Sequence, residues 1–259
     1  MLTAAGSTPH IHIPFQRIEE HICLIADRKL NLEIYFSAEV LDAADERRLE
    51  LIHELLSYGP DISFHAPFMD LCPAALDARI REVTRARFEQ TFTAASIFKP
   101  KCIVFHSGYE KWKYSLKFEP WLENSMSFWA PLIERASILN TKIAIENIFE
   151  NEPSNLLMLM QRTGSPHFGV CFDTGHFNLF SDVSLSAWMD TLKDYLIELH
   201  LHDNDKSADQ HLPVGDGIFD FGSLFQIVKG RDLIYTIETH TPERVLRSMN
   251  RLGEFMPAV

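Results

Sequence analysis

The chain has 259 residues, a length that fits one α/β barrel and can bury a large core. Hydrophobic residues make up 46% and charged residues 23%, as is usual for soluble globular proteins. The net charge of −12 argues against a general affinity for polyanions such as nucleic acids, although it does not exclude a local basic groove.

The sequence gives no sign of a membrane or secreted protein. No window approaches about 18 consecutive apolar residues, so we expect no membrane span. The stretch MLTAAGSTPHIHIPFQ lacks a basic region followed by an apolar one, so we expect no secretory signal. The four cysteines form no CxxC pair, and Cys102 and Cys171 fall in strand-like runs. This pattern predicts reduced, packed thiols in a cytoplasmic protein.

Short runs rich in β-branched and aromatic residues recur along the chain and predict strands. A weak candidate, LTAAGS (2–7), comes first. The clear candidates that follow are LEIYF (32–36), ISFHAP (62–67), CIVFHSG (102–108), IAIEN (143–147), FGVCFDTGH (168–176), LIELHLHD (196–203) and LIYTIET (233–239).

Segments between these runs carry apolar residues at helical spacing, which predicts helices packed on a sheet. The examples are Phe15, Ile18, Ile22 and Ile25, then Leu185, Trp188, Leu192 and Tyr195, and finally Val245, Met249 and Leu252. Strands that alternate with helices indicate βαβ units and a parallel sheet. Eight such units predict a single-domain (β/α)8 TIM barrel over residues 1–259, with the active site at the C-terminal ends of the strands.

From the run ISFHAP onward, every predicted strand ends in a side chain that can bind a metal ion. In chain order these side chains are His65, His106, Glu146, Asp173 with His176, His200 with His202, and Glu238. Because the C-terminal ends of barrel strands converge on one face, we expect these residues to share a pocket.

Each of these residues taken alone has an ordinary structural explanation. A lone histidine is more often hydrogen-bonded than metal-bound, and a lone glutamate can cap the next helix. Six successive strands with such ends favour metal binding over separate structural roles, because carboxylates at a barrel mouth need a cation or must become neutral. Few lysines or arginines follow the strands, so the pattern predicts a bound divalent metal. A mixed set of His, Asp and Glu suits zinc, manganese or iron.

Six motifs at these strand ends are specific enough to compare with known families. They are FHSG (105–108), IEN (145–147), DTGH (173–176), HLHD (200–203), DQHLPVGDG (209–217) and IET (237–239). With HAP (65–67), they resemble the xylose-isomerase-like TIM barrels, the superfamily that groups endonuclease IV with sugar isomerases and epimerases. The resemblance covers nearly the whole chain.

The resemblance implies a set of metal ligands. Endonuclease IV binds three metals with nine ligands, which fall here on His65, His106, Glu146, Asp173, His176, His200, Asp209, His211 and Glu238. Epimerases of the superfamily hold one metal with the residues that match Glu146, Asp173, His200 and Glu238. In those epimerases the two glutamates also act as acid and base. One departure is Gly175, where endonuclease IV has a cysteine, and the nuclease's DNA-reading insertions are not identifiable.

The stretch HLHDNDKSADQHLPVGDG (200–217) has two readings: a solvated turn, or a strand end followed by a loop that carries ligands. Its position after the seventh strand favours the second reading. His202 could be a metal ligand, a proton shuttle or a partner that orients a metal-bound group, and the last role is preferred. Asp203 is expected to orient a ligand or a loop amide, and both residues are also candidate substrate contacts.

The segment KWKYSLKFEPW (111–121) interleaves basic and aromatic residues on the predicted catalytic face, and Trp112 and Lys113 are its candidate substrate contacts. Such interleaving suits contact with nucleic-acid phosphates combined with stacking on the aromatic rings. A lid that stacks a tryptophan on a sugar, or a solvated helix start, is favoured because the segment is short and the chain is acidic.

The preferred prediction is a sugar or sugar-phosphate isomerase or epimerase. It would bind one to three Zn, Mn or Fe ions, use no organic cofactor and transfer a proton through a metal-stabilised enediolate, with Glu146 and Glu238 as acid and base. The alternative is a metal-dependent phosphodiesterase that acts on abasic DNA like endonuclease IV, and its support is that all nine ligand positions carry the required residue type. A non-catalytic ligand-binding barrel is a third reading, and homo-oligomer formation stays open.

Overall fold

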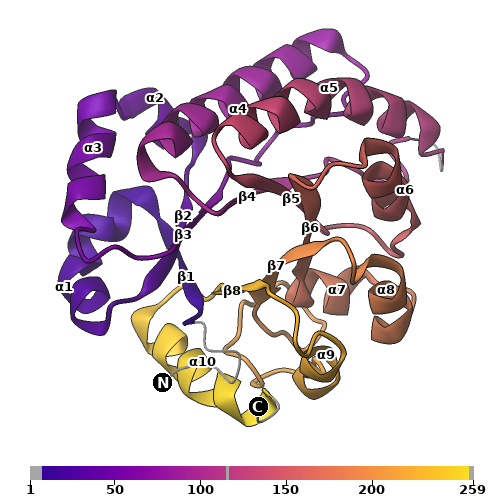
Figure 1. The fold of residues 1–259 in the computed structure, drawn as a ribbon. Helices are drawn as coiled ribbons and strands as arrows, with labels where there is room; N and C mark the ends of the chain where they lie inside the picture. Colours follow the sequence, from indigo (N-terminus) through magenta and orange to yellow (C-terminus); the bar gives the residue numbers. More distant parts are fainter. Residues whose placement is uncertain (1–7, 115–116, 257–259) are drawn as a thin grey trace.

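The computed structural model describes residues 8–114 and 117–256. Eight parallel strands form a closed barrel in chain order, and the first strand pairs with the eighth (Figure 1). The strands are β1 (His10–Pro14), β2 (Asn31–Tyr35), β3 (Ile62–His65), β4 (Cys102–His106), β5 (Lys142–Glu146), β6 (Phe168–Asp173), β7 (Leu196–Leu201) and β8 (Ile234–Ile237). The predicted (β/α)8 TIM barrel is therefore confirmed.

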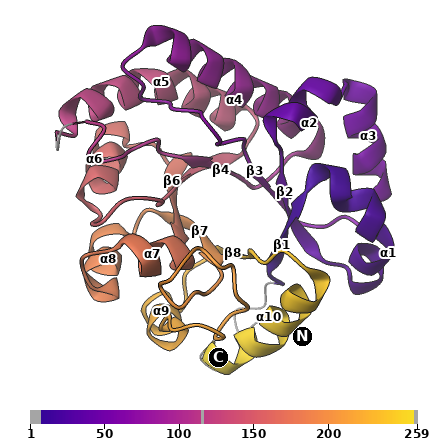
Figure 2. The same cartoon turned by 180° about the vertical axis from the view of Figure 1, so that it is seen from behind.

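Helices surround the barrel on its outside, as both views show (Figures 1 and 2). They are η1 (Phe15–Arg17), α1 (Ile18–Arg28), α2 (Ala38–Ala43), α3 (Glu46–Leu55), α4 (Ala78–Phe98), α5 (Glu119–Ile138), α6 (Ser154–Thr163), α7 (Thr174–Phe180), α8 (Leu185–Leu192), α9 (Phe221–Ile227) and α10 (Pro242–Phe255). Within the described ranges, no helix combines the length and apolar character that a membrane span requires.

The first strand is not where the sequence predicted it. Residues 2–7 lie outside the described residues, and β1 is His10–Pro14 instead. Its sequence HIHIP alternates: Ile11 and Ile13 belong to the apolar core, while His10 and His12 contact polar residues of β3 and β2. A strand of a parallel sheet is usually apolar on both faces, so a segment that contains two histidines was not predicted as a strand.

The main core lies between the strands and the helices. Trp121, Trp129 and Trp188 on α5 and α8 are fully buried there. Some helices begin at a capping side chain: the Ser184 side chain accepts the N–H of Ala187 at the start of α8. Of the residues predicted at helical spacing, Tyr195 is the exception, since it lies in the turn between α8 and β7.

The interior of the barrel is unusually polar. His10 hydrogen-bonds Ser63 at 2.8 Å, and Ser63 donates to Glu198 at 3.1 Å. Burial, with a contribution from the negative Glu33, raises the pKa of Glu198 to about 8. A small cluster that includes the free thiols Cys102 and Cys171 packs beside these groups.

Candidate metal centre

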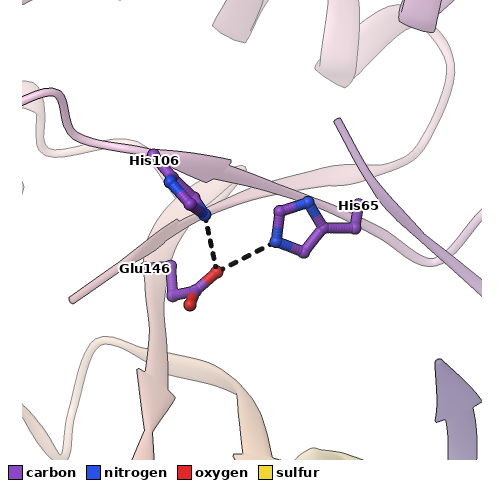
Figure 3. A group of neighbouring side chains, drawn as sticks. All are labelled: His65, His106 and Glu146. Atoms are coloured by element: carbon purple, nitrogen blue, oxygen red, sulfur yellow. Dashed lines mark hydrogen bonds and ion pairs between the residues drawn. The ribbon is translucent and has the colours of Figure 1, made fainter. Parts of the chain in front are cut away.

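The ends of β3, β4 and β5 bring two histidines onto one glutamate. The Nε2 atoms of His65 and His106 lie 3.1 and 3.4 Å from Oε2 of Glu146 (Figure 3). His65 and Glu146 are almost completely buried. The other ring nitrogen of His65, Nδ1, donates to the carbonyl oxygen of Ala66 at 2.9 Å, which leaves Nε2 facing the glutamate.

A second group surrounds the Nδ1 atom of His200, near the end of β7. Oε2 of Glu238 lies 3.2 Å away, Oε2 of Glu146 3.6 Å and Oδ2 of Asp173 3.7 Å. Asp173 ends β6 and Glu238 follows β8, so four strands contribute to this point. Nδ1 of His200 and Oε2 of Glu238 are buried and have no hydrogen-bond partner among the described residues.

A third group adjoins the first two. Nε2 of His176, in the first turn of α7, lies 3.4 Å from Oδ2 of Asp209. Nε2 of His211 lies 3.0 Å from the same oxygen. Nδ1 of His176 is 3.0 Å from Oε1 of Glu146, which links this group to the others. The structure therefore brings all nine predicted ligands together at the C-terminal ends of the strands.

The donors fit a divalent metal. Glu146, Asp173 and Glu238 are buried, yet in residues 8–114 and 117–256 none of them pairs with a lysine or arginine. Among the described side chains, those that pair with these three carboxylates are all histidines. Buried carboxylates without a fixed cation are costly, and a metal ion would supply the missing charge. The orphaned Nδ1 of His200 and Oε2 of Glu238 would be direct ligands.

Without a bound metal ion, protons on the neighbouring histidines offset the negative charge of the carboxylates. Burial raises the pKa of Glu146, but His106 and His200 outweigh burial and hold it well below its ordinary value. Burial lowers the pKa of His200, but the negative groups around it raise it overall, well above 6.5. Metal binding is therefore expected to release protons.

Two residues in this network were missed by sequence reasoning. Glu33, in the middle of β2, is fully buried, and its Oε2 lies 3.0 Å from Nε2 of His200. Its Oε1 meets a second imidazole, at 2.8 Å from Nδ1 of His12 on β1. The only signal in the sequence was a charged residue inside an apolar strand.

His202 contacts the cluster from just beyond β7. Its Nε2 lies 2.9 Å from Oδ2 of Asp173, and its ring stacks on that of His211 with centroids 4.0 Å apart. A Cβ at position 175 would lie 2.0 Å from Cε1 of His202. Glycine is therefore required at position 175 while His202 holds this position.

Asp203 anchors the loop that carries Asp209 and His211. Its Oδ1 accepts the N–H of Phe219 at 3.1 Å, and its Oδ2 accepts the N–H of Gly217 at 2.9 Å. It is fully buried. Of the roles considered for Asp203, the structure shows contacts with loop amides, and the stretch 200–217 is an anchored loop rather than a solvated turn.

Two cavities meet at the cluster. One, of about 520 Å³, is lined by His65, His106, Glu146 and Lys113. The other, of about 440 Å³, extends toward β1 and α10 and is lined by His12 and Tyr35. Both are bounded by Phe68, His211 and Glu238, so a ligand at the metal centre can reach either one.

The segment 111–121 offers less aromatic surface than the sequence suggested. Trp112 is 74% exposed, but Tyr114 and Trp121 are buried, and Nε1 of Trp121 donates to the carbonyl of Ser107. Lys113 lines the first cavity and lies 3.5 Å from Sγ of Cys72. Residues 115 and 116 lie outside the described residues. The described part of this segment therefore offers too little exposed aromatic surface for successive nucleic-acid bases to stack on.

Comparisons with known proteins agree with this architecture. The sequence profile of a family described as "Xylose isomerase-like TIM barrel" matches residues 31–254. The uncharacterized protein MJ1311 of Methanocaldococcus jannaschii is 28% identical over 213 residues, which cover 78% of this chain and 72% of that protein.

Solved structures share the fold along nearly the full length. A D-tagatose 3-epimerase-like protein superposes with a TM-score of 0.81 at 24% identity, covering 95% of this chain and 96% of that one. The TTHB071 protein from Thermus thermophilus, soaked with zinc chloride, gives a TM-score of 0.80 at 22% identity, covering 96% and 98%.

Proposed function

The chain belongs to the xylose isomerase-like TIM barrel family, and from this premise we propose that it is a divalent-metal-dependent epimerase or isomerase of sugars or sugar phosphates. One observation carries the proposal: Glu146, Asp173 and Glu238 all direct an oxygen at the unpartnered Nδ1 of His200. These are the four positions that the resemblance to the epimerases implied.

In this proposal the two glutamates exchange the proton. Glu146 ends β5 and Glu238 follows β8, so they reach the cleft from different strands of the barrel mouth. One removes the proton next to the sugar carbonyl and keeps it, and the other, protonated beforehand, delivers its own proton to the opposite face. A bound divalent metal would polarise the carbonyl and offset negative charge on the sugar oxygens. Asp173 and His200 hold the centre in place.

The remaining cluster residues suit substrate binding in an enzyme with one metal. His65, His106 and His176 surround Glu146 and line the same cavity. They would fix the orientation of Glu146 and donate hydrogen bonds to sugar hydroxyls. The fold neighbour described as D-tagatose 3-epimerase-like supports the choice of reaction class, and the neighbour soaked with zinc chloride makes zinc a reasonable first metal to test.

Solvent-proton exchange tests this function. The protein is loaded with zinc, manganese or cobalt and incubated with a panel of ketohexoses and their phosphates in D2O. We expect a substrate of this panel to gain one deuterium beside its carbonyl, because the donating carboxyl exchanges its proton with the solvent. Glu146→Gln is expected to abolish the exchange, while Glu134→Gln on the exposed side of α5 keeps it. Absence of label from every sugar contradicts the proposal.

A phosphodiesterase is the second candidate, because the first and third groups could hold two further metals. His65 with His106, and His176 with Asp209 and His211, supply the donors. The net charge of −12 and the single exposed aromatic among the described residues of segment 111–121 argue against a DNA substrate. Cleavage of an abasic-site duplex at nanomolar protein, with three metals bound per chain, would favour the phosphodiesterase over the epimerase or isomerase.

A further inference from the structure

Glu33 lies between the metal centre and the second cavity. Its side chain is fully buried, and each of its two oxygens meets a different imidazole. Oε2 is 3.0 Å from Nε2 of His200, and Oε1 is 2.8 Å from Nδ1 of His12. An ionised carboxylate can only accept hydrogen bonds, so both rings must turn an N–H toward it.

The first contact decides which nitrogen of His200 is available to a metal. With Nε2 protonated toward Glu33, Nδ1 of a neutral ring carries the lone pair. That atom lies 3.2 Å from Oε2 of Glu238, and neither atom has a hydrogen-bond partner among the described residues. A carboxylate behind a histidine in this way fixes the ring and increases its basicity toward a metal.

The second contact decides what His12 presents to the cleft. With Nδ1 protonated toward Glu33, its Nε2 is left as a hydrogen-bond acceptor. Nε2 has no partner in the part of the chain that the structure describes, and His12 lines the cavity of about 440 Å³. The ring is held between Tyr35, stacked at 5.8 Å, and the edge of His65 at 5.7 Å. It also lies beside Glu238, with Nδ1 4.0 Å from Oε1.

We propose that Glu33 is a positioning residue for both halves of the site: it aims Nδ1 of His200 at the metal and Nε2 of His12 at the substrate. His12 is then a substrate-binding residue that accepts a hydrogen bond from a hydroxyl of a polyhydroxylated ligand. The His200 half depends only on the metal centre. The His12 half rests on the proposed sugar substrate.

A zinc titration tests the metal half without any turnover. In Glu33→Gln the amide can accept from one imidazole only, and its NH2 faces the other. We expect the Kd for zinc, measured by competition with a chelating dye, to rise roughly 10- to 100-fold. Glu150→Gln is the matched control, because it makes the same change at another buried carboxylate, whose oxygens accept from the hydroxyl of Ser107 and the N–H of Ile148. Equal zinc affinity in Glu33→Gln and the wild type overturns the proposal.

A measurement on the wild type covers the case in which Glu33→Gln does not fold. Nitrogen-15 spectra of the zinc-loaded protein report which ring nitrogen of each histidine carries a proton. We expect a proton on Nε2 of His200, and loss of that signal in His200→Asn identifies it. A proton on Nδ1 of His200, with zinc on Nε2, overturns the proposal.

His12→Asn tests the substrate half. Its zinc affinity should equal that of the wild type, whereas Glu33→Gln loses zinc affinity. For whichever ketohexose the wild type converts, KM should rise roughly three- to tenfold, as expected for one neutral hydrogen bond, with kcat changed less. An unchanged KM removes His12 from substrate binding. If the wild type neither binds nor converts a ketohexose, the proposed function and the His12 half both fall, while the zinc titration still decides the role of Glu33 toward His200.

Discussion

Glu198 should make the protein less stable as the pH rises through the neutral range. It is fully buried beneath the metal centre, where Ser63 donates to Oε1 at 3.1 Å, and its Oε2 has no partner among the described residues. Burial and the nearby Glu33 raise its pKa from 4.5 to about 8. The folded protein therefore keeps a proton on Glu198 that the unfolded chain releases above 4.5.

The sign and size follow from proton linkage. Because the native state binds more protons between pH 4.5 and about 8, stability falls across this window and is level above it. A pKa difference of one corresponds to about 1.4 kcal/mol, so the whole displacement corresponds to about 5 kcal/mol and the part below pH 7 to about 3 kcal/mol. Glu198→Gln mimics the protonated form and removes this dependence.

Urea unfolding of the wild type and Glu198→Gln, with chelator present, measures the effect. The variant should gain about 5 kcal/mol on the wild type between pH 4.5 and pH 9, with most of the gain before pH 8. Glu134→Gln, an exposed position on α5, should track the wild type within about 0.5 kcal/mol at every pH. A difference between Glu198→Gln and the wild type that does not change with pH refutes the assignment of a buried, protonated carboxyl.

Two substitutions at the metal centre have distinct expected outcomes. Glu238→Gln should keep the thermal stability of the chelated protein and lose sugar turnover by a factor of about 100 or more, because it removes a proton-transferring group; an active variant removes Glu238 from the mechanism. Gly175→Ala places a Cβ 2.0 Å from Cε1 of His202, so the ring must leave Asp173. Zinc affinity should then fall about 10-fold or more, and a crystal structure with His202 unmoved would contradict this explanation of Gly175.

Much of this fold could be predicted from the sequence because apolar strands and amphipathic helices alternate along the chain. The strand ends were readable for the same reason: once the strands are placed, the topology sends His65, His106, Glu146 and Glu238 to one face. The first strand escaped detection because His10 and His12 interrupt its apolar pattern and face the barrel interior.

The supporting partners could not be predicted, because they depend on which residues meet across the barrel. Glu33 and His200 are 167 positions apart and meet only when β2 and β7 face each other inside the closed sheet. The role of Asp203 could not be predicted without the course of the loop, because Asp203 accepts the backbone N–H groups of Gly217 and Phe219. The spacing of residues along the chain is enough to predict which side chains lie at the strand ends. Contacts between side chains inside the barrel can be predicted only when the register of the strands is known.

Metal content tests the proposed centre at the barrel mouth without reference to any substrate. The protein, purified and dialysed against buffer with zinc or manganese, is analysed by plasma mass spectrometry, and its melting temperature is recorded with and without chelator. We expect at least one divalent metal per chain, a lower melting temperature on chelation, and loss of metal in His200→Ala. A metal-free wild type whose melting temperature does not change with chelator would contradict the metal centre.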